Sequence, residues 1–504
     1  MIQFVKKSVS VLSAFLLLFI GMVQPFPSAF PVYAEEEETL SYGDFEYSVS
    51  EFGEVTIVNY TNYGAEEVTV PATIDGNTVG IIGSQAFAYK SSLKSVTLPR
   101  HIRVIRSSAF AYCDNLSSIN LPESLNVIDM YAFRNCKALK EITLPKALWF
   151  VECCIFMNTG IESINIPPYL SEVDDPFAKS NISSITFDPE CTQIVSKLFD
   201  DCDKLESVVI PEGITTINAW SFAFCDNLTS VKLPSTLTRI GSFAFENCPN
   251  LTSMEFPEGL ISIGGYAFED CKKLAEVKLP STLQSLGGQA FGNTAMESIV
   301  LPAALTYGTN TFEDSILKEA TLTESMTKVP DNLFNLCVTL KKVVMPDSIT
   351  SIGVSSFANC ISLEQFIVAK SVESIGETAF QNCTSLTDLA ILNPECEIFD
   401  ADTTIDANST IYGNRNSTAE AYAKKYGRTF IALNNNLEYD FNADGAFSVA
   451  DIVLFTRVLA EDPTVNLPVC DVDGDEILTI LDVGMLFEFL QTQEQLPDFI
   501  SMIS

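Results

Sequence analysis

Two twelve-residue stretches near the C-terminus place oxygen-bearing side chains at the same five positions. They are DFNADGAFSVAD, residues 440–451, and DVDGDEILTILD, residues 471–482. Side-chain oxygens at positions 1, 3, 5, 9 and 12, with a backbone carbonyl at position 7, follow the spacing by which one loop wraps a calcium ion. The predicted ligands are Asp440, Asn442, Asp444, Ala446, Ser448 and Asp451 in the first loop, and Asp471, Asp473, Asp475, Ile477, Thr479 and Asp482 in the second. Because the donors are hard oxygens without Cys or His, both loops favour Ca²⁺ over zinc.

The two predicted calcium sites differ at loop position 6, which is Gly445 in the first loop and Glu476 in the second. The turn at this position normally needs a positive φ, which a residue with a Cβ adopts only with strain. We therefore expect the second site to bind calcium more weakly than the first.

An apolar run follows each loop, IVLFTRVLA from residue 452 and VGMLFEFL from residue 483, and predicts a helix. The residues that enter the first loop are short and polar, and position 12 is Asp rather than Glu in both loops. This tandem of loop–helix units, residues 437–504, resembles a type I dockerin. The resemblance implies a secreted protein that docks, with calcium, onto a cohesin domain of a cellulosome-type scaffoldin.

In dockerins, loop positions 10 and 11 lead the contact with cohesin, and in this chain they are apolar. The resemblance implies a cohesin contact formed by Val449, Ala450, Ile480 and Leu481, together with Arg457. The two apolar pairs differ in size, so we expect the two docking orientations to differ. The alternative is that these side chains only pack the core of the dockerin itself.

The N-terminus has the features of a secretory signal, residues 1–34. Lys6 and Lys7 precede an apolar run over residues 9–23, and Val32-Tyr33-Ala34 supplies a cleavage site. The alternative is an uncleaved anchor, although the run is short for a membrane span. Loss of the two lysines takes the formal charge from −36 to −38. Such a charge disfavours nucleic acid and anionic membranes as partners. From the signal segment we expect an extracellular protein without a membrane span after cleavage.

The body of the chain is a repeat with a period of 21–23 residues, in which each unit contains A-F-x-x-C or a variant of it. Its phenylalanines are Phe87, Phe110, Phe133, Phe156, Phe177, Phe199, Phe222, Phe245, Phe268, Phe291, Phe312, Phe334, Phe357 and Phe380. The alternation V-x-L predicts a short strand that a proline ends, and Gly241 is expected to allow a tight turn. Because one unit cannot bury its apolar face alone, the units must stack. The expected fold is a curved repeat solenoid of about fourteen coils with short parallel strands.

These units resemble the BspA-like leucine-rich repeats of bacterial surface and secreted proteins, with the pattern L-x-x-I-x-L-P-x-x-L-x-x-I-G-x-x-A-F-x-x-C. By this resemblance residues 35–84 form an N-terminal cap, and residues 85–433 form the repeats with a C-terminal cap. A helix is expected over Thr418 to Tyr426 within that cap. Residues 434–436 are the expected linker to the dockerin.

The chain has fourteen cysteines, and nine of them occupy one column of the repeat, where four other coils carry Thr or Ser. Only Lys90, in the first coil, departs from this preference for small residues. Stacked equivalents have parallel Cβ vectors, which is poor geometry for a disulfide. We therefore predict buried free thiols, with the adjacent Cys153 and Cys154 as a possible exception.

Two surface columns are candidates for ligand binding. The outward positions of the strand are mostly small and polar, lack aromatic rings and include in later coils Lys232, Glu255, Glu276, Lys278, Val300, Val344 and Ile367. The column before the A-F pair holds Trp220, Phe243 and Tyr266 in successive coils. These three rings are a candidate platform for a glycan or an apolar partner. The alternative is that they pack against neighbouring turns.

Catalysis is not expected. The only histidine, His101, follows a strand-ending proline, so no Ser/His/Asp set can be assembled without it. The repeats and caps leave no stretch long enough for a catalytic domain. The sequence therefore predicts a secreted, non-catalytic binding or adhesion protein held on a scaffold, whose repeats bind a protein, a polysaccharide or a cell surface. The alternatives are an inhibitor or adaptor for scaffold-borne enzymes and, less favoured, a polysaccharide-degrading enzyme.

Overall fold

The computed structural model describes residues 38–302, 306–308, 310–324 and 326–433. The predicted signal segment, the linker, both calcium loops and the cohesin-contacting residues lie outside the described residues. The expectations about them therefore remain predictions.

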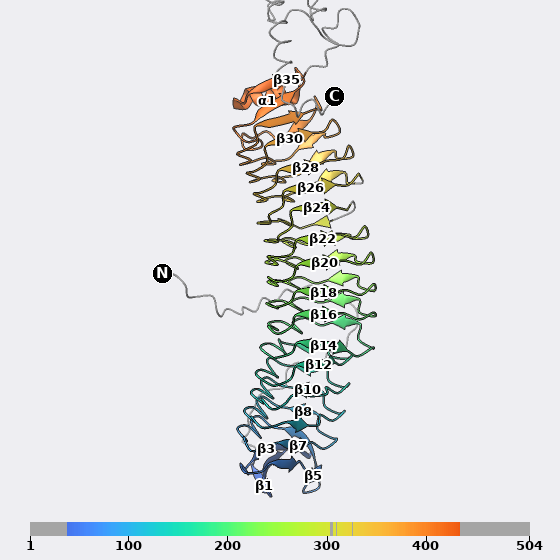
Figure 1. Cartoon of the computed structure of the whole chain (residues 1–504), viewed down its shortest axis with the longest axis vertical. Coiled ribbons are helices and arrows are strands. Elements are labelled where there is room, and N and C mark those ends of the chain that lie inside the picture. Colours follow the sequence, from blue (N-terminus) through green and yellow to red (C-terminus); the bar gives the residue numbers. More distant parts are fainter. Residues whose placement is uncertain (1–37, 303–305, 309, 325, 434–504) are drawn as a thin grey trace, which may run out of the picture. The chain divides into compact units, whose positions relative to one another are not determined.

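The described chain is a solenoid in which each coil contributes two short strands, except that the coil with residues 141–143 has no first strand (Figure 1). The first strand is the V-x-L segment, and it pairs in parallel with first strands of neighbouring coils. The first strands are β7 (Ser95–Thr97), β9 (Ser118–Ile119), β12 (Ser163–Ile166), β14 (Ser184–Phe187), β16 (Ser207–Val209), β18 (Ser230–Lys232), β20 (Ser253–Glu255), β22 (Glu276–Lys278), β24 (Ser298–Leu301), β26 (Glu319–Leu322), β28 (Lys342–Val344), β30 (Gln365–Val368) and β32 (Asp388–Ile391).

The second strand of each coil is two residues long and also pairs in parallel with its equivalents. The second strands are β8 (Val104–Ile105), β10 (Val127–Ile128), β11 (Phe150–Val151), β13 (Glu172–Val173), β15 (Gln193–Ile194), β17 (Thr216–Ile217), β19 (Arg239–Ile240), β21 (Ser262–Ile263), β23 (Ser285–Leu286), β25 (Thr306–Tyr307), β27 (Lys328–Val329), β29 (Ser351–Ile352), β31 (Ser374–Ile375) and β33 (Glu397–Ile398).

Different elements close the two ends of the array. At the N-terminal end β1 (Leu40–Tyr42), β2 (Phe45–Val49) and β3 (Glu54–Tyr60) form an antiparallel meander, and β5 (Thr73–Ile74) pairs with β6 (Asn77–Ile82). β6 begins the second-strand ladder, and β4 (Glu67–Thr69) begins the first-strand ladder. At the other end β34 (Thr410–Gly413) and β35 (Phe430–Ala432) extend the first-strand ladder, which gives about 16 turns in all.

The helix expected in the C-terminal cap is confirmed as α1 (Thr418–Tyr426). Ser417 caps its N-terminus by accepting a hydrogen bond from the backbone N–H of Glu420, and Gly427 ends it in the left-handed conformation. These are the residues that helix ends favour.

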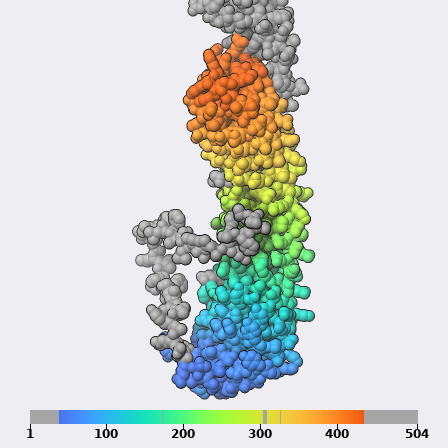
Figure 2. Space-filling model, turned by 90° about the vertical axis from the view of Figure 1, so that its left-hand side faces the viewer, coloured from blue at the N-terminus to red at the C-terminus, as the bar shows by residue number. Residues whose placement is uncertain are grey.

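The core is one continuous ladder of phenylalanine rings. All fourteen repeat phenylalanines are fully buried. Each ring lies over that of the next coil, with centroids 5.1–6.3 Å apart. Successive coils follow one another as bands of colour along the array (Figure 2). The predicted solenoid of stacked coils is therefore confirmed.

The chain turns around each core phenylalanine through two left-handed residues. The residues two before and two after the phenylalanine have φ between 47° and 63° in all fourteen coils. Gly241 precedes such a turn, but its own φ is not positive. A Cβ there would lie 2.7 Å from the backbone nitrogen of Ala219, so glycine is needed for the close approach of two coils.

The cysteines of the described residues are free, and the nine in the repeat column are buried, as predicted. Each of the nine thiols donates to the carbonyl of the core phenylalanine one coil earlier, at 3.0–3.6 Å. In three other coils the hydroxyls of Thr159, Thr294 and Ser315 donate to the phenylalanine of their own coil. Burial raises the pKa of Cys113 to about 12, so the thiol stays protonated and can donate.

Lys90, the exception in this column, is also buried, with its ammonium 3.4 Å from the ring centroid of Tyr63 in the N-terminal cap. The adjacent Cys153 and Cys154 are free and half-buried.

Candidate binding surfaces

A groove crosses the outward face of β20, β22, β24 and β26. It consists of two adjoining hollows of about 870 and 580 Å³, which share Glu258, Val277, Lys278 and Ser298. β22 ends a two-stranded sheet and β24 begins a three-stranded one, so the first-strand ladder is interrupted between them. The shorter spacing from Phe291 to Phe312 follows directly. The groove therefore spans one of the breaks in the first-strand ladder; others fall between β14 and β16 and between β18 and β20.

The groove combines apolar and charged groups. Val300 is 59% exposed and lies with Val277 among the lining residues. Lys278 and Glu319 are exposed and opposite in charge. The carboxylate of Glu258 accepts hydrogen bonds from the hydroxyl and backbone N–H of Ser281, at 2.9 and 3.2 Å. A surface of this kind suits a polypeptide, whose side chains offer both apolar and charged groups.

The outward strand positions of the repeat coils lack aromatic rings, as expected, but one ring from the inward column lines the groove. Phe256 lines the smaller hollow, while its ring packs edge-on against Phe268 of the core at 5.7 Å. It follows β20 in the column where later coils carry Leu279 and Leu301. An inward-facing apolar column thus reaches the surface just after β20.

The three rings proposed as a ligand platform lie face to face. The ring centroids of Trp220 and Phe243 are 4.5 Å apart, and those of Phe243 and Tyr266 are 4.8 Å apart, with planes parallel to within 5°. All three residues are half-buried. We call them the aromatic stack. Because each ring covers its neighbour, the stack presents mainly ring edges, and the inner faces are not available to a sugar.

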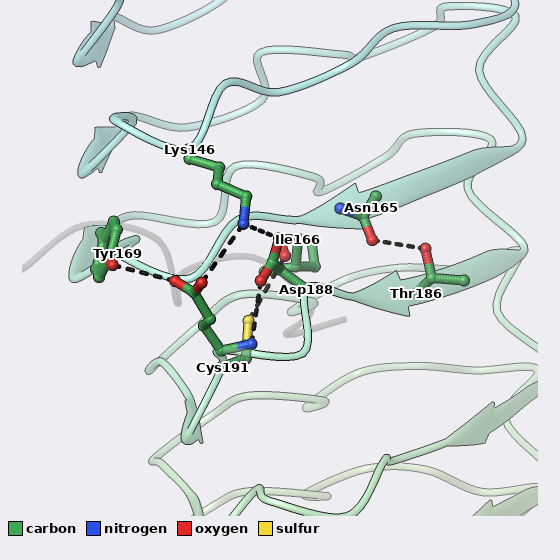
Figure 3. Close-up of polar contacts among 8 residues, drawn as sticks. Lys146, Asn165, Ile166, Tyr169, Thr186, Asp188 and Cys191 are labelled. Carbon is green, nitrogen blue, oxygen red and sulfur yellow. Dashed lines mark hydrogen bonds and ion pairs between the residues drawn. The ribbon is translucent and has the colours of Figure 1, made fainter. Parts of the chain in front are cut away.

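A cluster of charged and polar side chains lies at the ends of β12 and β14 (Figure 3). Lys146 lies 3.0 Å from the carboxylate of Asp188 and 3.7 Å from that of Glu190. The hydroxyl of Tyr169 donates to Glu190 at 3.1 Å. The backbone N–H of Glu190 and the ammonium of Lys146 lower the pKa of Asp188, so this carboxyl is not a proton donor at neutral pH. These ion pairs and the hydrogen bond link side chains of three successive coils, so the cluster stabilises their stacking.

A second pair of acids, Asp175 and Asp200, lies beside the core phenylalanines Phe177 and Phe199 of successive coils. Burial and the charges of Asp175 and Asp201 raise the pKa of Asp200 to about 7. Burial also raises the pKa of Asp175, and Lys197 bonds the neighbouring Asp174 at 2.9 Å. Burial and the repulsion of neighbouring acids therefore explain both raised pKa values.

Within the described ranges, no three His, Cys, Asp or Glu side chains are grouped so as to hold a metal ion. The only metal sites that the chain predicts are the two loops at 440–451 and 471–482, which lie outside those ranges. No helix among the described residues is long and apolar enough to cross a membrane.

Parallel strands repeated at a fixed interval around a stacked aromatic core define a leucine-rich repeat solenoid. A model of the BspA type leucine rich repeat region matches residues 59–176, 192–315 and 306–402. The chain belongs to this family. Members of it are repeat proteins that are typically found at cell surfaces and generally bind rather than catalyse.

The fold agrees with that of one of the solved structures to which the chain is similar. A leucine-rich repeat protein from Bacteroides ovatus is 24% identical, with a TM-score of 0.57, over 78% of this chain and 100% of that chain. A leucine rich cell surface protein from Faecalibacterium prausnitzii is 24% identical, with a TM-score of 0.35, over 74% of this chain and 97% of that chain. A comparison with curated proteins found no match.

Proposed function

We propose that the protein is a secreted, non-catalytic adhesion protein whose coils bind a protein ligand and whose tail docks, with calcium, onto a cohesin domain of a cellulosome-type scaffoldin. The observation that supports the binding role is the groove over β20, β22, β24 and β26, with its exposed Val300 between charges of opposite sign.

The docking role rests on the sequence of the tail. The predicted ligand spacing occurs twice, at Asp440–Asp451 and Asp471–Asp482, and an apolar run follows each loop. Calcium supplies charge neutralisation in such loops, and the carboxylates supply most of the ligands. Val449, Ala450, Ile480, Leu481 and Arg457 are the proposed contacts with cohesin.

Substitution in the groove tests the binding role. The intact protein, captured on a cohesin surface in calcium, is presented with arrays of purified extracellular proteins and, separately, with plant polysaccharides. Val300→Glu places a charge in the groove and is expected to abolish binding of the protein ligand. Val209→Glu is the matched control, because Val209 is the third residue of its strand and is 64% exposed, outside the groove.

The proposal predicts loss of ligand binding with Val300→Glu, unchanged binding with Val209→Glu, and equal capture of both variants by cohesin. Ligand binding that survives Val300→Glu would refute the groove as the site. Binding to polysaccharide alone would replace the protein ligand with a glycan, and release of reducing sugar would contradict a non-catalytic role.

A further inference from the structure

The aromatic stack of Trp220, Phe243 and Tyr266 occupies a column that does not favour such residues. Each has a positive φ, of 55°, 60° and 60°. For residues with a Cβ this conformation is costly, and Asn pays least among them. Asn310 and Asn332 fill the same column in later coils. The backbone conformation therefore does not explain why aromatic residues occupy these three positions. Core packing does not explain them either, because the separate phenylalanine ladder already fills the core.

Two carboxylates lie beside the stack. The turn after each ring brings Glu246 N–H to the carbonyl of Phe243 and Glu269 N–H to the carbonyl of Tyr266, both at 3.2 Å. The Trp220 side chain of the preceding coil acts against the rise that burial causes in the pKa of Glu246. Glu246 and Glu269 thus each follow a ring of the stack by three residues along the chain.

These carboxylates lack a cationic partner. Among the ion pairs of the described array, none includes Glu246 or Glu269. In earlier coils, by contrast, Asp201 is paired with Lys179 at 2.6 Å. Burial raises the pKa of both Glu246 and Glu269, and the charge of Glu246 adds to the rise at Glu269. Both groups are therefore half-buried negative charges that an external cation would stabilise.

The ring geometry limits what can bind. The inner faces of the stack are covered, so flat stacking of sugar rings along it is not available. Ring edges and exposed ring carbons can still cover the methylene stem of a long basic side chain, whose charged end then reaches the carboxylates.

We infer that the aromatic stack, together with Glu246 and Glu269, is a docking surface for a basic segment of a partner protein, with an arginine side chain pairing with the carboxylates while its stem lies against the rings. A basic partner is inferred from charge complementarity. The chain has a formal charge of −36, and these two carboxylates form no ion pair within the described array. Arginine fits better than lysine, since its planar fork can bond both oxygens of a carboxylate.

This surface is separate from the groove. The stack comes from the turns before each core phenylalanine, whereas the groove is lined by the first strands and the residues after them. Val300→Glu is expected to leave the stack unchanged, so the failure of one proposal would not imply the failure of the other.

The chain offers a local optical probe for the test. Trp149 and Trp220 are its two tryptophans, so Trp149→Phe leaves Trp220 in the stack as the sole reporter. The intact Trp149→Phe protein is titrated with a tri-arginine peptide blocked at both ends, and Trp220 fluorescence is followed. The isosteric tri-citrulline peptide, which has no charge, is the control ligand.

We expect saturable fluorescence change with tri-arginine and none with tri-citrulline. In the same background, Glu246→Gln with Glu269→Gln is expected to weaken binding by about fivefold or more, because both proposed ion pairs are lost. Glu123→Gln with Glu162→Gln removes the same charge at exposed positions outside both the stack and the groove and is expected to change affinity less than about twofold. Equal weakening by both double variants, no saturable change, or equal binding of tri-citrulline would each overturn the proposal.

Discussion

Replacing Phe245 with alanine is expected to destabilise the array by about 3–5 kcal/mol. Phe245 is fully buried, and its ring centroid lies 5.3 Å from those of both Phe222 and Phe268. Truncation removes the transfer free energy of the ring and leaves a cavity between two neighbours. The coils cannot close that cavity freely, because strand hydrogen bonds fix their spacing.

Phe224→Ala is the matched control, since Phe224 belongs to the neighbouring coil and is 41% exposed. Its substitution is expected to change stability by about 0.5 kcal/mol or less. Denaturant unfolding of the intact proteins, followed by circular dichroism, measures both changes. Hydrogen exchange in the Phe245→Ala protein should lose protection first near Phe222 and Phe268, because each coil contacts only its neighbours. If Phe245→Ala costs no more than Phe224→Ala, the ladder does not hold the array together.

Three further predictions concern separate parts of the chain. Glu476→Gly is expected to tighten calcium binding by the second loop, predicted to be the weaker site, about fivefold or more by relieving strain at loop position 6, as calorimetric titration would show; unchanged affinity would contradict that reason. The pKa of Asp200 is raised from 3.8 to about 7, so the folded state holds a proton that the unfolded state releases, and stability falls as pH rises between these values. Asp200→Asn should therefore match the native Tm near pH 4 and exceed it near pH 8, by about 1–3 °C; an equal offset at both pH values would exclude this cause. Gly287→Ala should lower Tm strongly, because its Cβ would lie 2.1 Å from the backbone nitrogen of Gly265, whereas Gly259→Ala, with 3.4 Å to its nearest neighbour, should lower it little; equal losses would contradict the packing argument.

The repeat made the fold predictable from the sequence alone. Phe245 and its equivalents recur at nearly constant intervals, and a constant interval fixes which side chains meet in neighbouring coils. The buried thiols followed from the same logic, because Cys248 and its equivalents occupy a single column. The bounds of α1 were predictable since Ser417 and Gly427 are strong end signals.

Other features depend on how neighbouring coils are arranged in space. The sequence period of the repeat does not determine that arrangement. The groove crosses β22 and β24, which fall in separate sheets, and no residue type marks that separation. The left-handed residues were also not predicted, because Trp220, Phe243 and Tyr266 are not residues that favour a positive φ. The stacking of these rings could be expected from their column, but their covered faces became apparent only from the geometry.

Calcium-dependent docking is best tested by capture of the intact protein on a panel of immobilised type I cohesin domains, in calcium and then in EDTA. We expect binding to at least one cohesin in calcium, release in EDTA and recovery when calcium is restored. The variant with Asp440→Ala and Asp471→Ala should not bind under any of these conditions. Binding that persists in EDTA, or that survives the double substitution, would contradict calcium-dependent docking through the two loops.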